Sequence, residues 1–204
     1  MKTLSILSTK LSAWGLHLIG RGGSMPGSIG CKVDANILSK LKFNGPVILV
    51  TGTNGKTTIG YMMYQMMTML DIPCAYMGTI GFYYCGNFIK MVNTTPDVDV
   101  LYEYFIKAKD AGCKVLVMEV SSHALAKDRI YGLEFDEVAF TNLTQDHLDF
   151  HKTFENYFQA KYKLFQRSRI KIINIDDNYG KRALENLKNE NAKDVYTYSI
   201  KEES

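Results

Sequence analysis

The chain has 204 residues, enough for one sizeable hydrophobic core with a short appendage. It is 46% hydrophobic and 22% charged, a composition typical of folded globular domains, and no apolar run is long enough to span a membrane. The net charge is only +3, and like charges are not clustered, which argues against a nucleic acid or a membrane as partner.

Residues 1–44 are predicted to form a helical lead-in segment. Their apolar side chains recur at helical spacing and would make one stripe of an amphipathic helix, which we expect to pack on the next domain or on a partner: Leu4, Leu7, Leu11, Trp14 and Leu18. Loop-forming glycines follow between Gly20 and Gly30, and a short helix is predicted from Ala35 to Leu41.

The four cysteines are scattered along the chain and none has C-x-x-C spacing: Cys31, Cys74, Cys85 and Cys113. This spacing disfavours a zinc ribbon and fits a reducing compartment such as the cytoplasm. We therefore expect four thiols without a chemical role.

A phosphate-binding loop is predicted where the apolar strand Val47–Thr51 runs into Gly52-Thr-Asn-Gly-Lys-Thr57 and then into a proline-free helix. The free N–H groups and the positive end of that helix favour an anion, and glycines let the backbone approach it. Lys56 adds a positive charge for the phosphates, and the Thr57 hydroxyl is suited to Mg²⁺. The spacing departs from the general G-x-x-x-x-G-K-[ST] pattern, whose first glycine would fall at Val50.

Downstream of this loop, apolar strands alternate with helices, which predicts an α/β fold with a mostly parallel sheet covered by helices on both faces. The predicted strands are Val47–Thr51, Cys74–Met77, Val115–Val120, Glu137–Phe140, Ile170–Ile175 and Val195–Tyr198. The predicted helices are Thr57–Leu70, Val98–Ala111, Phe154–Phe165 and Tyr179–Asn189. We therefore expect a three-layer domain of the P-loop type, whose ligands gather at the carboxyl ends of the strands.

Ionisable residues stand at the ends of two of these strands. Glu119 ends an apolar strand, where a carboxylate is costly unless it is paired with Lys or Arg or bound to a metal such as Mg²⁺. The loop after Phe140 carries Asp146, His147 and Asp149. His147 could ligate a metal or polarise an oxygen, or it could be a structural residue.

Four motifs in this order resemble the Mur ligase family: Thr51-Gly-Thr-Asn-Gly-Lys-Thr-Thr58, Asn93-Thr-Thr-Pro96, Met118-Glu-Val-Ser-Ser-His-Ala-Leu125 and Phe140-Thr-Asn-Leu-Thr-Gln-Asp-His-Leu-Asp149. The resemblance covers about residues 46–178 and is strongest to the MurE type. It implies that residues 45–204 form the central ATP-binding domain. It also implies an ATP-dependent carbon–nitrogen ligase of peptidoglycan synthesis, which adds an amino acid to UDP-N-acetylmuramoyl-L-alanyl-D-glutamate through an acyl phosphate.

The resemblance also implies ATP and Mg²⁺ as cofactors and assigns roles to individual residues. ATP would be bound by Gly52, Thr53, Asn54, Gly55, Lys56, Thr57 and Thr58. Mg²⁺ ions would be held by Thr57, Glu119, His147 and a carbamylated Lys161, and the catalytic set would be Lys56, Glu119, His147 and Lys161. The muramoyl dipeptide would be bound by Asn93, Thr94, Thr95, Ser121 and Arg129.

The chain departs from the MurE type at both ends. About 45 residues precede the phosphate loop, too few for the usual UDP-binding domain, and the stretch Arg21–Leu41 resembles the lead-in of MurT-type amidating subunits. The Asp-Asn-Pro-Arg motif that binds the incoming amino acid is absent from the sequence. We therefore expect that these 204 residues alone do not complete ligation and need a partner chain or a further domain.

Three other functions stay open at this point. The first is a MurT-like amidating subunit that works with a glutaminase, although the cysteine-rich insert of that type is missing. The second is another Mur-like ligase that acts on folates or polyglutamate. The third is a non-catalytic nucleotide-binding fragment, for which the apolar stripe of residues 1–44 would be the docking surface.

Overall fold

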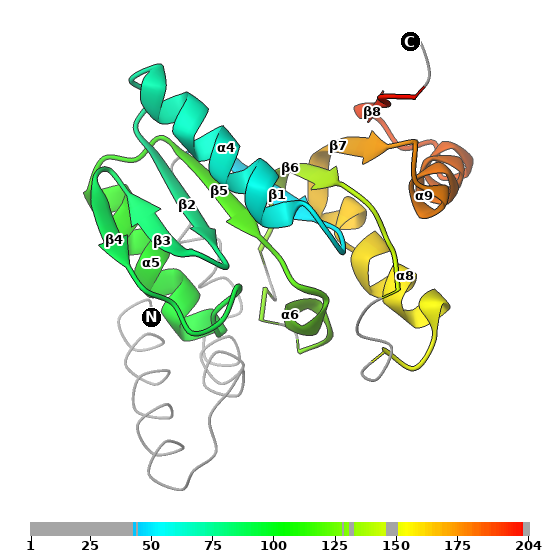
Figure 1. Cartoon of the computed structure of the whole chain (residues 1–204), viewed down its shortest axis with the longest axis horizontal. Coiled ribbons are helices and arrows are strands. Elements are labelled where there is room, and N and C mark those ends of the chain that lie inside the picture. Colours follow the sequence, from blue (N-terminus) through cyan, green and yellow to red (C-terminus); the bar gives the residue numbers. More distant parts are fainter. Residues whose placement is uncertain (1–42, 44, 128, 131–132, 146–150, 202–204) are drawn as a thin grey trace, which may run out of the picture.

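The computed structural model describes residues 43, 45–127, 129–130, 133–145 and 151–201, which Figure 1 draws in colour. The predicted lead-in helices, including the apolar stripe from Leu4 to Leu18, lie outside the described residues and stay predictions. Within the described part of the chain, no helix has the length and apolarity that crossing a membrane requires.

The described residues form one eight-stranded sheet with the strand order β4-β3-β2-β5-β1-β6-β7-β8. Six neighbouring strands, from β2 to β8 in this order, are parallel, and β3 pairs antiparallel with both β2 and β4. The strands are β1 (Val47–Thr51), β2 (Cys74–Gly78), β3 (Gly81–Tyr84), β4 (Asn87–Ile89), β5 (Val115–Glu119), β6 (Phe135–Phe140), β7 (Ser168–Asn174) and β8 (Val195–Tyr198).

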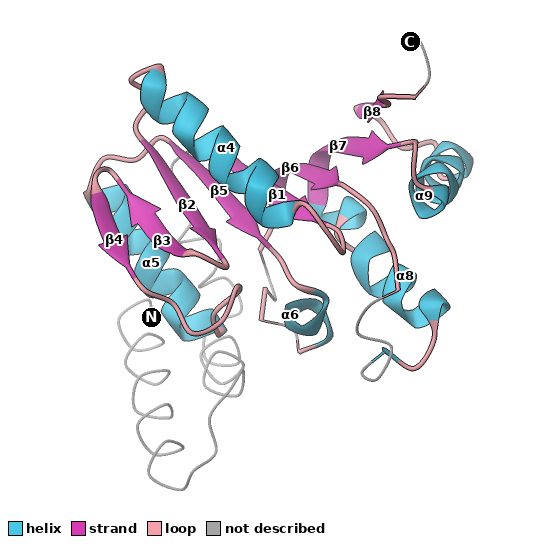
Figure 2. Ribbon diagram, viewed as in Figure 1, coloured by secondary structure: helices cyan, strands magenta, loops and turns pink. Residues whose placement is uncertain are grey.

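Helices cover both faces of the sheet, as Figure 2 shows for α4 and α5. The described helices are α4 (Lys56–Met69), α5 (Val98–Asp110), α6 (Ser122–Ala126), α8 (Phe154–Tyr162) and α9 (Asn178–Asn189), with a 3₁₀ turn at Phe165–Arg167. The predicted three-layer architecture with a mostly parallel sheet is therefore confirmed.

The core explains why the central strands read as continuous apolar runs. All five residues of β1 are buried, because its alternate side chains point to the two covered faces. Ile48 and Val50 join Val117 under α4, whereas Leu49 packs with Leu116 in the larger cluster on the opposite face. Polar alternation is absent from β1 because neither of its faces meets water.

The strands β3 and β4 and the helix α6 were not predicted from the sequence, and one predicted helix was three residues too long at its C-terminal end. The hairpin β3–β4 turns at Gly86, whose φ of +83° favours glycine, and α6 is only one turn and a half long. The predicted helix Phe154–Phe165 ends at Tyr162, because the next bonds, such as that from the Leu164 N–H to the Lys161 carbonyl, are of the tighter 3₁₀ kind.

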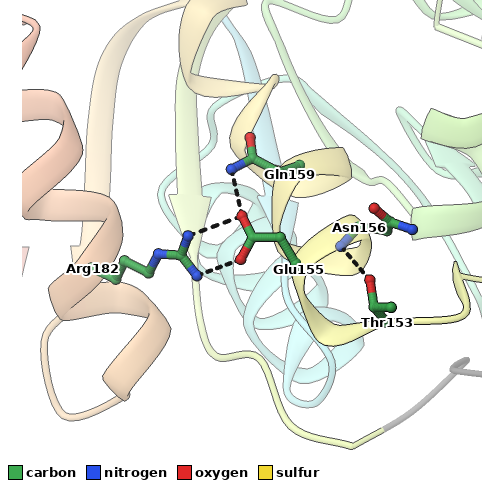
Figure 3. Close-up of polar contacts among 5 residues, drawn as sticks. All are labelled: Thr153, Glu155, Asn156, Gln159 and Arg182. Carbon is green, nitrogen blue, oxygen red and sulfur yellow. Dashed lines mark hydrogen bonds and ion pairs between the residues drawn. The ribbon is translucent and has the colours of Figure 1, made fainter.

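Side chains join the helices α8 and α9, as Figure 3 shows. The Arg182 guanidinium of α9 donates two hydrogen bonds, of 2.7 and 2.9 Å, to the Glu155 carboxylate of α8. These bonds hold the pKa of Glu155 below its ordinary value, and Gln159 adds a third bond of 2.9 Å. This exposed pair links α9 to the helix that carries Lys161.

Both helices begin at side-chain caps. The Thr153 hydroxyl accepts a hydrogen bond from the Asn156 N–H at the start of α8 (Figure 3). The Asp177 carboxylate accepts from the N–H groups of Tyr179 and Gly180, both at 3.0 Å, at the start of α9. These caps satisfy N–H groups that have no partner inside the helix.

Asp177 also joins α9 to the loop after β6, because its second carboxylate oxygen accepts a hydrogen bond of 3.2 Å from the Leu143 N–H. We predict that Asp177→Ala lowers the free energy of unfolding by about 1–2 kcal/mol, since it removes a cap and a loop contact together. Urea denaturation followed by circular dichroism measures this change. Asp177→Asn keeps an acceptor oxygen and is the control; an alanine variant as stable as the asparagine variant would contradict the prediction.

Candidate active site

The phosphate-binding loop lies between β1 and the N-terminus of α4, and two of its backbone positions require glycine. Gly55 caps the helix in the left-handed conformation with φ +82°. Gly52 has φ +154°, and a Cβ there would lie 1.9 Å from the Thr141 hydroxyl oxygen. The loop therefore passes directly against the residue that follows β6.

The loop after β6 holds the phosphate-binding loop through hydrogen bonds. The Asn54 N–H donates to the Asn142 side-chain oxygen at 2.9 Å, and the Thr141 hydroxyl donates to the Asn54 carbonyl at 2.7 Å. The Thr53 N–H donates to the Asn142 carbonyl at 2.9 Å, and its hydroxyl accepts from the Thr144 N–H at 3.0 Å. The two loops that the sequence singled out are therefore one connected unit.

Two lysines from different elements converge on one carbonyl oxygen of this loop. Lys56 Nζ donates to the Gly52 carbonyl at 2.9 Å, and Lys161 Nζ donates to the same oxygen at 2.8 Å. Lys161 is only 1% exposed; its amine also donates to the Thr51 hydroxyl at 3.3 Å and lies 5.0 Å from the centre of the Tyr157 ring. Lys56, at the N-terminus of α4, puts positive charge where the helix end already favours an anion.

Glu119 ends β5 with its side chain fully buried beside the phosphate-binding loop. Its carboxylate accepts hydrogen bonds from the hydroxyls of Thr57 at 2.9 Å and Thr79 at 3.1 Å, from the Thr79 N–H at 3.1 Å, and from the Tyr76 hydroxyl. Its described partners are thus hydroxyl and amide groups rather than the Lys or Arg considered as an alternative. A carboxylate next to a threonine hydroxyl is an oxygen donor set that fits Mg²⁺.

Gly78 packs directly against this carboxylate and leaves no room for a side chain on that side. A Cβ at Gly78 would lie 2.0 Å from a Glu119 carboxylate oxygen and 2.2 Å from the Tyr76 hydroxyl oxygen. Burial raises the pKa of Tyr76, and its hydrogen bond to Glu119 raises it further. Tyr76 therefore keeps its proton and serves as a hydrogen-bond donor to the carboxylate.

The predicted substrate residues Thr95, Ser121 and Arg129 come together just beyond the end of β5. The Thr95 hydroxyl donates to the Glu119 carbonyl at 3.1 Å and accepts from the Ser121 N–H at 3.2 Å. Arg129 donates to the Thr95 carbonyl at 2.9 Å. These contacts connect the segment after β4 to the segment after β5, and substrate binding by the three residues stays a prediction.

The other two predicted substrate residues precede Thr95. The Thr94 hydroxyl lies 3.1 Å from the Thr79 hydroxyl, which itself contacts the Glu119 carboxylate. Asn93 is exposed. The Asn93–Thr95 segment thus reaches the carboxylate through one intervening hydroxyl.

His147 lies outside the described residues, as do its neighbours Asp146 and Asp149, so its predicted metal role stays a prediction. Thr58 is exposed in the first turn of α4. Among the residues that the structure does describe, no three His, Cys, Asp or Glu side chains cluster as a metal site.

Sequence reasoning missed Tyr76 and Thr79, two of the residues that hold Glu119. The available signal was position, since Thr79 directly follows the carboxyl end of the parallel strand β2. Tyr76 gave no such signal, because a tyrosine inside an apolar strand reads as part of the core.

The fold and the loop are those of a P-loop-type α/β domain, in which a strand, a glycine-bearing turn, Lys-Thr and a helix form an anion site. The family model described as the Mur ligase middle domain matches residues 50–204. The chain therefore belongs to the Mur ligase family.

The relatives are similar over most of this chain. The UDP-N-acetylmuramoyl-L-alanyl-D-glutamate–2,6-diaminopimelate ligase of Clostridium perfringens is 45% identical over 174 residues, which cover 82% of this chain and 36% of the relative. The ligase of the same name from Clostridium tetani is 47% identical over 169 residues, covering 83% of this chain and 33% of the relative. This chain thus spans about a third of the length of these curated relatives.

A solved structure of a ligase with this name superposes with a TM-score of 0.71 at 30% identity, covering 89% of this chain and 36% of that one. The likeness therefore extends from the sequence to the three-dimensional arrangement of the sheet and its helices.

If Tyr76 orients Glu119, its hydroxyl should matter for metal-dependent nucleotide binding. We predict that Tyr76→Phe raises the Mg²⁺ concentration needed for half-maximal ATP binding about tenfold, because losing a hydrogen-bond partner of a metal ligand weakens metal affinity. ATP binding without Mg²⁺ should stay unchanged. Isothermal titration calorimetry over a Mg²⁺ series measures both quantities.

The matched control is Tyr83→Phe, a tyrosine whose ring lies 6.2 Å from that of Tyr76 in the same aromatic cluster. Mg²⁺ dependence that is identical in wild type and Tyr76→Phe would show that the hydroxyl does not support a metal ligand.

Proposed function

We propose that this chain provides the nucleotide-binding part of an ATP-dependent ligase of peptidoglycan synthesis. The ligase joins an amino acid to the D-glutamate carboxylate of UDP-N-acetylmuramoyl-L-alanyl-D-glutamate in the cytoplasm. The observation that carries this proposal is the contact between Thr57 of the phosphate-binding loop and the buried Glu119 carboxylate. The relatives support the substrate, since their names specify that dipeptide and 2,6-diaminopimelate.

The reaction proceeds in two steps. An oxygen of the D-glutamate carboxylate attacks the γ-phosphorus of ATP, and the bond from this phosphorus to the oxygen of the β-phosphate breaks. ADP departs, and the substrate becomes an acyl phosphate. The amine of the amino acid then attacks the acyl carbon, and the tetrahedral intermediate expels phosphate as the nitrogen loses a proton. The protein's part is to position the reactants and to stabilise negative charge.

Individual residues divide this work. The N–H groups at the start of α4 and the Lys56 ammonium would bind the phosphates. Thr57 and Glu119 would hold Mg²⁺, with His147 and carbamylated Lys161 as further ligands, and the ion neutralises phosphate charge when bound. Thr79 and Tyr76 keep the Glu119 carboxylate in place through their hydrogen bonds.

The segments after β4 and β5 would receive the muramoyl dipeptide. Arg129, which forms an ion pair of 2.8 Å with Asp97 and donates to the Thr95 carbonyl, is held beside these segments and would supply hydrogen-bond donors for the substrate. The hydroxyls of Thr94 and Ser121 and the amide of Asn93 supply hydrogen-bonding groups, and buried Thr95 holds the two segments together. The acceptor carboxylate would then lie at the carboxyl ends of the strands, as does the phosphate-binding loop.

ATP binding is the first test of the proposal. We predict that Lys56→Ala weakens Mg-ATP binding about 10–100-fold, because it removes a positive charge at the phosphates, while the circular dichroism spectrum stays unchanged. Calorimetry measures the affinity, and Lys107→Ala on the exposed side of α5 is the control for loss of a lysine. Equal affinity in wild type and Lys56→Ala would remove the basis for the nucleotide assignment.

Lys161 tests the metal-ligand assignment. Its buried amine can bind CO₂ as the neutral base, which turns a cation into a carboxylate and reverses its interaction with Mg²⁺. A unit charge and a divalent ion about 4 Å apart interact by about 8 kcal/mol at an effective dielectric constant of about 20, so the sign of this charge matters. We predict that Lys161→Ala abolishes ligation by the assembled enzyme and that added short-chain carboxylates partly restore it.

The control is Lys163→Ala, because Lys163 directly follows the last residue of α8 and is exposed, whereas Lys161 is buried. Mg²⁺-dependent ATP binding, compared with and without bicarbonate, gives a second readout that does not need ligation. If Lys163→Ala abolished ligation and Lys161→Ala had little effect, the ligand role would have been assigned to the wrong lysine.

A further inference from the structure

Three cysteines that are far apart in the sequence meet near the amino ends of the parallel strands β2 and β5. Cys74 begins β2, and Cys113 lies two residues before β5, whose first residue pairs with Cys74. Cys85 follows the end of the antiparallel strand β3, and its N–H donates to the Cys74 carbonyl at 3.4 Å. The phosphate-binding loop lies at the other, carboxyl ends of the parallel strands, so the cysteines are separate from the site described above.

Two of the three thiols are in contact. The sulfurs of Cys85 and Cys113, 28 residues apart in the chain, lie 2.8 Å from each other. A disulfide has an S–S length of about 2.05 Å, so less than an ångström of movement separates this pair from a bond. Cys85 is exposed, whereas Cys113 is only 4% exposed, so an oxidant in solution reaches the pair through Cys85.

We propose that Cys85 and Cys113 are a site of reversible oxidative modification, at which a low-molecular-weight disulfide converts the two thiols into an intramolecular disulfide. The Cys85 thiolate, its proton lost to solvent, attacks one sulfur of oxidised glutathione and releases one glutathione thiolate, which takes up a proton. The Cys113 thiolate, likewise deprotonated, then attacks the Cys85 sulfur of this mixed disulfide and releases the second glutathione. Two protein thiols are oxidised and one glutathione disulfide is reduced.

The surroundings of the thiols support this order of events. Burial raises the pKa of Cys113, and the neighbouring Cys85 raises it further, so the exposed thiol is the better first nucleophile. Cys74 is also buried, and its sulfur lies 3.5 Å from the Tyr64 carbonyl and 3.6 Å from the Thr68 hydroxyl. Cys74 thus has other partners and serves as a matched control thiol.

The disulfide would tie the end of β3 to the junction between α5 and β5. Closing a loop of this length restricts the unfolded chain, which in the chain-entropy account corresponds to a rise in Tm of about 5–10 °C for a domain of this size. Dithiothreitol should reverse the rise.

Peptide mapping of the folded protein tests the proposal directly. All proteins carry Cys31→Ser, so that only the three clustered cysteines react, and each is incubated with oxidised glutathione and then digested without reduction. We expect a Cys85–Cys113 linked peptide in this background and in Cys74→Ser, and none in Cys85→Ser or Cys113→Ser. The Tm should rise only in the proteins that form the link.

Two outcomes would overturn the proposal. One is a mixed disulfide that stays on Cys85 without reaching Cys113, and the other is a link from Cys85 to Cys74 instead. Peptide mapping of the protein that carries only Cys31→Ser is enough to distinguish these outcomes. The test therefore does not depend on whether Cys113→Ser folds.

Discussion

The structure around the strand ends depends on the burial of one carboxylate. A buried charge such as that of Glu119 is costly unless hydrogen bonds replace its water, and here three hydroxyls and one backbone N–H do so. These donors come from the first turn of α4, from β2 and from the turn after β2. Satisfying this one group therefore fixes the relative positions of three segments that are distant in sequence.

The strand order explains why the carboxylate lies where it does. β5 lies between β2 and β1, and in the parallel register Glu119 pairs with Val50, just before the phosphate-binding loop. The carboxyl ends of the three strands are consequently level, so side chains from all of them reach a common space. A shift of β5 by one residue would turn the Glu119 side chain to the other face, which makes the register itself a requirement of the site.

Much of the fold could be predicted because its signals are local. An apolar run bounded by Gly52 and a proline-free helix identifies β1 and α4 without knowledge of the rest of the chain. The support of Glu119 by Tyr76 and the contact between Cys85 and Cys113 could not be predicted in this way. Both depend on which strands become neighbours, and the order β3-β2-β5-β1 is a property of the packed sheet rather than of any segment.

The two lysines on the Gly52 carbonyl differ in how firmly they are held, and this difference separates their roles. Lys161 is buried and fixed by the packing of α8, whereas Lys56 is partly exposed at the start of α4 and donates also to the Thr53 carbonyl. The long side chain of Lys56 can therefore follow an arriving phosphate, whereas the amine of Lys161 keeps its place against the loop. A group that moves with an anion suits phosphate binding, and a group held in place by packing suits a metal ligand. This difference is consistent with the separate roles proposed above for the two lysines.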